Sequence, residues 1–225
     1  MFDTIKKTNG THEIPADTRK RILEAAGEVF AISGYRNTTI REICRSAGVN
    51  VAAVNYHFRN KDGLYLALLQ YRQEVAFRKY PLDFGTASTD PPEERLRAFI
   101  RSFVTRILGE GEVSRFGRLM AREYIEPTNA LDMVVEETIR PLFTRLSSIV
   151  RQLLGRKPKE ETVRLCSASI VGQCLYFLYA APVIKRLFQQ QEFGPKEIEA
   201  IADHIAGFSL HAIGSFADGK GGEKR

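Results

Sequence analysis

Apolar residues recur at helical spacing along almost the whole chain. In the first such segment, residues 17–33, they follow the pattern of one buried helix face, with Ile22, Ala26, Val29 and Phe30. Asp17 or Thr18 can cap this helix at its start. Gly34 can end it, because glycine readily takes the left-handed conformation of a helix C-terminus.

A short second helix is predicted over residues 39–47. Thr39 and Glu42 have the spacing of a capping box, in which each residue's side chain accepts a hydrogen bond from the other's backbone N–H. Gly48 marks the end of this helix after barely two turns. The apolar face of the helix consists of Ile40, Ile43, Cys44 and Ala47.

A third and a fourth helix follow closely. Asn50 is suited to cap a short helix over residues 51–56, and Asn60 a longer helix that reaches about residue 80. Two short helices joined by a glycine-containing turn and packed on a longer first helix form a helix-turn-helix. The first part of the chain therefore predicts this motif.

The rest of the chain reads as a larger helical body. Residues 81–92 are rich in Pro, Gly, Ser and Thr, which is typical of a linker. The sequence 90–93, Asp-Pro-Pro-Glu, starts a new helix with a cap, an N-terminal proline and a carboxylate. The expected helices cover residues 90–108, 113–125, 128–154 with a bend at Pro141, 159–181, 183–190 and 195–216.

These patterns predict an all-α protein, because no run of alternating β-branched residues bounded by turns indicates a strand. The expected architecture is a three-helix helix-turn-helix head that is joined by a long fourth helix to a larger helical body. The expected parts are a disordered arm (1–16), the DNA-binding domain (17–60), the connecting helix (61–80), the body (81–217) and a disordered tail (218–225).

Charge is distributed unevenly over the 225 residues. The formal net charge is +6, and residues 17–72 carry nine Lys/Arg against five Asp/Glu. An excess of positive charge around the predicted helix-turn-helix favours a polyanionic partner such as double-stranded DNA.

The three cysteines form neither a disulfide framework nor a metal site, since no Cys-x-x-Cys or Cys/His cluster occurs. A reducing cytoplasm, no bound metal and no cofactor are expected. Residues 165–184 carry no charge, which is the length of a membrane span. Their serines, glutamine and proline, and the lack of a second span, favour a buried helix and no membrane partner over a transmembrane helix.

In a helix-turn-helix, the second short helix faces the base edges in the major groove, and flanking donors contact phosphates. The alternative, a solvated polar face, is weaker because the basic and hydroxyl groups occur together. The expected DNA-binding residues are Thr39, Arg41, Asn50, Val51, Ala52, Ala53, Asn55, Tyr56, His57 and Lys61.

Residues 38–64, TTIREICRSAGVNVAAVNYHFRNKDGL, closely resemble the DNA-binding signature of TetR-type transcriptional regulators. Asn55 departs from that pattern, because many members have Tyr there; an asparagine amide can instead read adenine. Residues 120–155 are similar to the C-terminal domain of the CecR/CerR-like branch, in which an Arg-Glu pair, Glu-Pro-Thr and a later Arg-Pro recur. The resemblance implies a ligand-responsive regulator, a repressor linked to efflux or toxic-compound response.

Apolar stripes on the last two long helices exceed the need of one core, which favours a homodimer; a wide pocket within one subunit is the alternative. The expected dimer interface contains Cys174, Phe177, Ile198, Ile201, Ala202, Ile205, Phe208 and Ala212. The expected effector pocket, which the sequence does not separate from ordinary core, contains Phe99, Phe103, Met120, Arg122, Tyr124, Phe143, Leu146 and Tyr176.

The expected function is a regulator that binds a palindromic operator as a dimer and is released by a small-molecule effector. An enzyme is disfavoured, since there is no Gly-x-Ser-x-Gly, phosphate-binding glycine loop or His-Glu-x-x-His. The alternative is a ligand-binding or scaffolding helical protein with a non-functional DNA-binding head. The effector, the operator sequence and the choice between repression and activation remain open at this point.

Overall fold

The computed structural model describes residues 15–81, 83–188 and 193–217, and every regular element among them is a helix. The all-α prediction is confirmed. The described residues up to Leu68 form one compact unit, the head, and those from Leu69 form a second, the body. Apart from residues 15 and 16, the two terminal segments expected to be disordered lie outside the described residues.

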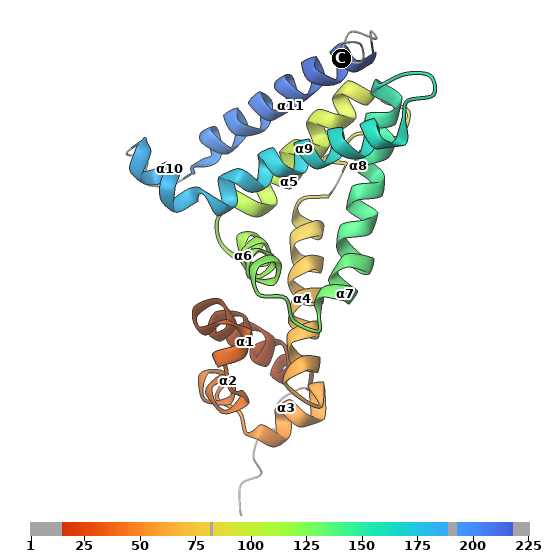
Figure 1. Cartoon of the computed structure of the whole chain (residues 1–225). Coiled ribbons are helices and arrows are strands. Elements are labelled where there is room, and N and C mark those ends of the chain that lie inside the picture. The colour runs from red at the N-terminus through yellow and green to blue at the C-terminus, as the bar shows by residue number, and fades with distance from the viewer. Residues whose placement is uncertain (1–14, 82, 189–192, 218–225) are drawn as a thin grey trace, which may run out of the picture. The chain divides into compact units, whose positions relative to one another are not determined.

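The head contains the four predicted helices (Figure 1). They are α1 (Pro15–Asn37), α2 (Ile40–Ala47), α3 (Val51–Phe58) and the first part of α4 (Lys61–Lys79). Helix α1 runs past its predicted end, but Gly34 within it has φ 76 and ψ 168, so the regular helix does break at that glycine.

One hydrophobic core joins the helices of the head. The predicted face of α1 is shifted slightly, because Val29 is only half-buried while Leu23 and Ala25 are buried. Helix α3 extends two residues beyond its predicted end, and this extension brings Phe58 into the core. The core is completed by Ile22, Ala26, Phe30, Ile43, Val54, Leu64, Tyr65 and Leu68.

The body consists of the last part of α4 and eight further elements. They are α5 (Pro92–Leu108), α6 (Glu112–Ile125), α7 (Leu131–Val134), the π-helix η1 (Val135–Ile139), α8 (Arg140–Leu153), α9 (Glu160–Tyr179), α10 (Ala181–Leu187) and α11 (Pro195–Ala217).

Two expectations for the body need correction. Residues 128–154 do not form one helix bent at Pro141, because the π-helix η1 interrupts them just before this proline. Proline has no N–H to donate to the preceding turn, and a π-turn is one way to accommodate that loss. Asp90 does not cap α5 either, since its Oδ2 accepts a hydrogen bond from the N–H of Ala87 at 2.8 Å.

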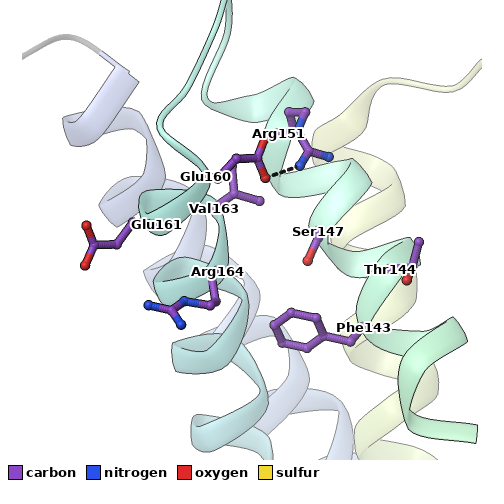
Figure 2. Close-up of a pocket in the computed structure, with 8 residues that line it drawn as sticks. All are labelled: Phe143, Thr144, Ser147, Arg151, Glu160, Glu161, Val163 and Arg164. Atoms are coloured by element: carbon purple, nitrogen blue, oxygen red, sulfur yellow. Dashed lines mark hydrogen bonds and ion pairs between the residues drawn. The ribbon is translucent and has the colours of Figure 1, made fainter. Parts of the chain in front are cut away.

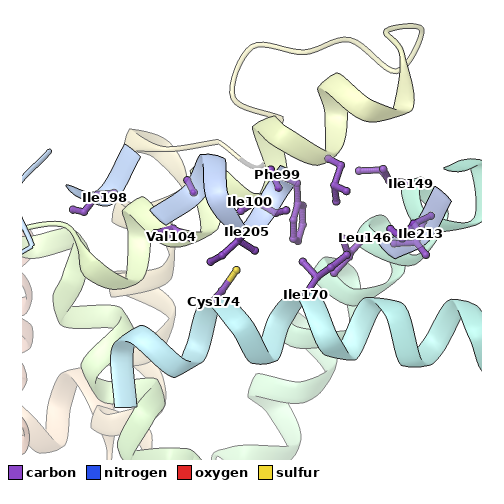
Figure 3. Close-up of a cluster of buried hydrophobic side chains, with 14 of the residues drawn as sticks. Phe99, Ile100, Val104, Leu146, Ile149, Ile170, Cys174, Ile198, Ile205 and Ile213 are labelled. Atoms are coloured by element: carbon purple, nitrogen blue, oxygen red, sulfur yellow. The ribbon is translucent and has the colours of Figure 1, made fainter. Parts of the chain in front are cut away.

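Helices α5, α8, α9 and α11 enclose the main core of the body. Figure 3 shows Ile170 and Cys174 of α9 directed toward apolar side chains of the other three helices. The core includes Phe99, Ile100, Val104, Leu146, Ile149, Ile198, Ile205 and Ile213.

The uncharged segment 165–184 is divided between α9 and α10, whose axes differ by 68°. No single helix within the described residues has the length and apolarity to cross a membrane. Among these residues, only the bent pair of α9 and α10, taken together, has that length and apolarity. The inward face of α9 contributes to the core, and Ser167 donates a hydrogen bond to Val163 O at 2.7 Å.

Candidate nucleic-acid interface and effector cavity

The start of α2 is held by the predicted capping box, which the structure confirms. The backbone N–H of Thr39 donates to Glu42 Oε2 at 2.7 Å, and the N–H of Glu42 donates to Thr39 Oγ1 at 3.3 Å. The Thr39 N–H bond, together with a second bond that the Thr39 hydroxyl donates to the same Oε2 at 2.9 Å, favours the charged carboxylate and lowers the pKa of Glu42. The box satisfies two backbone donors that would otherwise be free at the helix start.

The end of α2 is held from outside the motif. Gly48 adopts the left-handed conformation, with φ 65 and ψ 36, as expected for a glycine after a helix. Arg21 of α1 donates from Nη2 to the carbonyl of Ala47 at 3.0 Å. The turn between α2 and α3 is thereby fixed to α1.

Helix α3 presents one face to solvent and buries the other. Asn50 caps it, with Oδ1 accepting from the N–H of Ala53 at 2.9 Å. Val54 and Phe58, one turn apart, lie in the head core. Exposed on the opposite face are Val51, Ala52, Asn55 and Tyr56, the last with 81% of its surface accessible.

The connection from α3 to α4 leaves no space for a side chain at Gly63. A Cβ there would lie 2.2 Å from the carbonyl oxygen of Phe58. Asn60 Oδ1 accepts from the N–H of Gly63 at 2.8 Å, so Asn60 caps α4 as predicted. This close contact between the end of α3 and the first turn of α4 requires a glycine at position 63.

The expected phosphate-binding side chains differ in their exposure to solvent. Arg41 is exposed on α2, whereas His57 is half-buried between the rings of Tyr56 and Phe58. Lys61 is also half-buried: its Nζ lies 4.4 Å from the ring centroid of Tyr35 and donates to Arg36 O at 3.3 Å. Lys61 therefore joins α4 to the end of α1, a structural contact that the sequence did not predict.

Two further arginines of the head are exposed but were not among the expected DNA-binding residues. Arg45 lies on α2, and Arg59 directly follows α3 with φ 69. Both belong to the positive excess of residues 17–72, which was the only available signal for them.

The geometry of the head defines a class of protein: a DNA-binding regulator with a helix-turn-helix, in which α3 holds the position of the second short helix. A model of the N-terminal region of tetR-family bacterial regulatory proteins matches residues 22–68. A model of the C-terminal domain of the HTH-type transcriptional dual regulator CecR matches residues 92–213, more than half of the chain. The chain belongs to the TetR family of transcriptional regulators.

Curated relatives agree with this assignment. The chain is 28% identical to the HTH-type transcriptional dual regulator CecR of Shigella flexneri over 169 residues, which cover 71% of this chain and 74% of that protein. It is 39% identical to the regulator SrpR of Pseudomonas putida over 69 residues, or 31% and 32% of the two chains. The protein is therefore a transcriptional regulator of this family.

Solved structures share the fold. A structure of AibR in complex with isovaleryl coenzyme A and operator DNA superposes with a TM-score of 0.64 at 20% identity, covering 85% of this chain and 97% of that one. The TetR family regulator PfmR of Thermus thermophilus superposes with a TM-score of 0.63 at 19% identity, covering 85% and 95%.

The expected effector residues do not gather at one place. Phe103, Met120 and Tyr124 line a small cavity of the body, described further below. Phe99 and Leu146 lie in the main core instead, and Arg122 is exposed on α6.

Phe143 and Tyr176 lie at open surface depressions. Figure 2 shows the groove between α8 and α9 into which Phe143 points. An ion pair of 2.6 Å joins Arg151 and Glu160 in this groove. Tyr176 lines another depression, together with Phe177 and Phe188.

The expected dimer-interface residues are mostly inside the protomer. Cys174, Ile198, Ala202 and Ile205 are buried in its core, whereas Phe208 is 60% exposed. Phe177, Ile201 and Ala212 are half-buried. The sequence pattern located the apolar face of each helix, and that face packs against other helices of the same chain.

No cluster of three metal-binding side chains occurs within the described residues. Burial raises the pKa of the Cys174 thiol to about 12, so this group stays protonated at neutral pH.

The capping box can be tested by substituting Thr39. Thr39→Ala removes the acceptor of the Glu42 N–H and should lower the free energy of unfolding by roughly 0.5–2 kcal/mol in a urea titration. Thr39→Ser keeps the hydroxyl and should remain near the wild type. Equal stability of the two variants would show that the box does not stabilise the head.

The exposed face of α3 can be separated from its flanking charges in DNA-binding assays. Asn55→Ala should change the preference among operator base substitutions by about 1–3 kcal/mol, because a base contact is lost. Arg41→Ala should weaken binding to all sequences alike and reduce the slope of log K against log salt by about one. If Asn55→Ala lowers the affinity for all operator sequences equally, Asn55 contacts the DNA backbone and not a base.

Proposed function

We propose that this regulator is a ligand-responsive repressor that binds a palindromic operator as a homodimer. The observation that carries the proposal is the orientation of α3. Val54 and Phe58 anchor the helix in the head, while Val51, Ala52, Asn55 and Tyr56 face outward. Small apolar residues suit contact with thymine methyl groups, and an exposed amide suits adenine.

The outward faces of α9 and α11 support a homodimer. On α9, Leu165, Ala168, Gly172 and Tyr176 are exposed and follow one another at three- or four-residue spacing. On α11, the matching exposed positions include His204, Phe208, His211 and Ser215. A stripe of this kind, free of Lys, Arg, Asp and Glu, pairs well with a second copy in a four-helix interface.

Spacing of the two heads is the proposed switch. A palindromic site needs two recognition helices about 34 Å apart, in successive major grooves. An effector that binds more tightly to a body conformation with another spacing would release the DNA by its differential affinity. Helix α4 is the natural lever, because it starts in the head at Lys61 and ends in the body at Lys79.

Relatives give partial support for repression and for an effector. The repressor KstR2 of Mycolicibacterium smegmatis is 28% identical over 122 residues, or 51% of this chain and 59% of that protein. AibR has been solved with both operator DNA and a small molecule. CecR is named a dual regulator, so activation at some promoters is compatible with the proposal.

The function is tested by selecting bound fragments from the source genome and measuring their gel retardation. A regulator should retard a palindromic fragment selectively, and its affinity should fall steeply with salt as counterions are released. Retardation that is absent or independent of sequence would instead support a scaffolding protein with a non-functional head.

The dimer is tested with Phe208→Glu. The new carboxylate would lose its hydration in the proposed interface, so sedimentation should report a monomer. Ile125→Glu is a matched control, because Ile125 is 71% exposed on α6, outside the proposed interface, and should leave the dimer intact. An intact dimer in both variants would remove Phe208 from the interface.

A further inference from the structure

The body contains a small apolar cavity with one buried arginine in its wall. The cavity has a volume of about 70 Å³, and α4, α5, α6, η1, α8 and α9 all contribute to its lining. Its walls are largely aromatic and aliphatic. Of the described side chains that line it, Arg106 alone carries a charge.

Arg106 is 4% exposed, and its hydrogen bonding is incomplete. Nη1 donates to the carbonyl oxygen of Tyr80 at 3.2 Å. The guanidinium carbon lies 4.6 Å from the ring centroid of Phe77 and 6.0 Å from that of Phe103. Nη2 is buried and has no hydrogen-bond partner among the described residues, and no described carboxylate forms an ion pair with the group.

The stability of the folded protein gives no reason for an arginine at position 106. A buried cation without a counter-ion is costly, and apolar residues of similar size often replace buried charges without loss. The two ring faces and the negative end of α4, near Tyr80, offset part of this cost. Burial lowers the pKa of Arg106 to about 9, so the group still carries its charge at neutral pH.

We propose that this cavity binds the effector, a small apolar monocarboxylic acid, whose carboxylate accepts a hydrogen bond from Arg106 Nη2. This inference rests on the proposed function and specifies the chemical class of its effector. Guanidinium and carboxylate groups are complementary in charge and shape. A single negative charge is favoured, because Arg106 is the one charged group among the described residues that line the cavity, and the Tyr80 carbonyl would repel a second negative charge.

The size and entrance of the cavity limit the ligand. A volume of about 70 Å³ is far below the roughly 300–1,000 Å³ of sites for drug-sized molecules, so the acid is small or must widen the cavity as it binds. Tyr124 and Tyr179 line the cavity and are 47% and 37% exposed, so these two side chains belong both to its wall and to the protein surface.

The same arginine links the cavity to α4. Tyr80 directly follows α4 and holds Arg106 through its carbonyl, and Phe77 of α4 forms part of the wall. A carboxylate on Nη2 would therefore act on the last turn of the helix that begins in the head. This placement suits a ligand that controls the operator-bound state.

The unaltered full-length protein can be tested first by calorimetry. The ligands are the straight-chain acids from acetate to hexanoate, with benzoate, and the neutral amide of each acid. At least one acid should bind, and its amide should bind roughly 10- to 100-fold more weakly, because the charge-assisted hydrogen bond is lost. Absence of binding by all acids at millimolar concentration, or equal binding of acid and amide, would overturn the proposal.

Two variants identify the group responsible. Arg106→Met keeps an apolar side chain in the wall and should reduce acid binding by the same factor without weakening the amide. Arg101→Met is the matched control on α5, where Arg101 is half-exposed and pairs with Glu199 and Asp203, and it should bind the acid as the wild type does. Wild-type acid binding by Arg106→Met would also overturn the proposal; if this variant does not fold, the comparison of acids with amides decides alone.

Gel retardation separates this inference from the proposed function. An operator that is bound and then released by the acid supports both. Acid binding without release of a bound operator leaves the carboxylate site in place and contradicts the proposed switch. A bound operator with no acid binding leaves the DNA-binding function in place and contradicts the carboxylate site.

Discussion

Helices of eight residues are too short to persist alone in water, and this constraint governs the head. Both α2 and α3 have this length, so their stability must come from their ends and their buried faces. Thr39 and Asn50 satisfy backbone donors at the two starts, and Arg21 binds a carbonyl at the end of α2. These contacts and the buried faces hold both helices in place. The exposed side chains of α3 are therefore not needed for packing and are available for contact with DNA.

In the body, several buried polar side chains have hydrogen-bond partners. Buried Ser102 donates to the carbonyl of Pro81 at 2.7 Å, and Glu123 accepts two hydrogen bonds from Thr128. Arg106 contrasts with these satisfied neighbours, since its Nη2 has no partner in the described part of the chain. Unpaired buried donors are rare in folded proteins, which is why this atom, more than the size of the cavity, points to a ligand.

Local signals in the sequence predicted the head almost completely. The Thr39 and Glu42 pair, Gly48 and Asn50 each act through backbone hydrogen bonds or dihedral angles within a few residues, so the pattern alone locates them. The body was predicted less well. The π-helix before Pro141 and the burial of Cys174, Ile198 and Ile205 within the protomer depend on which helices meet, and periodicity does not contain that information.

The amino-acid sequence by itself determined the all-helical class, the helix-turn-helix and the side of α3 that can face DNA, because capping and helical periodicity are local properties. Only the tertiary structure decided that Lys61 contacts Tyr35, that Phe99 and Leu146 are core, and that Phe208 is exposed. It also decided that Arg106 is buried and that its Nη2 has no hydrogen-bond partner among the residues the structure describes. These outcomes depend on contacts between residues far apart in the chain, and the apolar faces that make such contacts look alike in sequence whether they meet a neighbouring helix, a ligand or a second subunit.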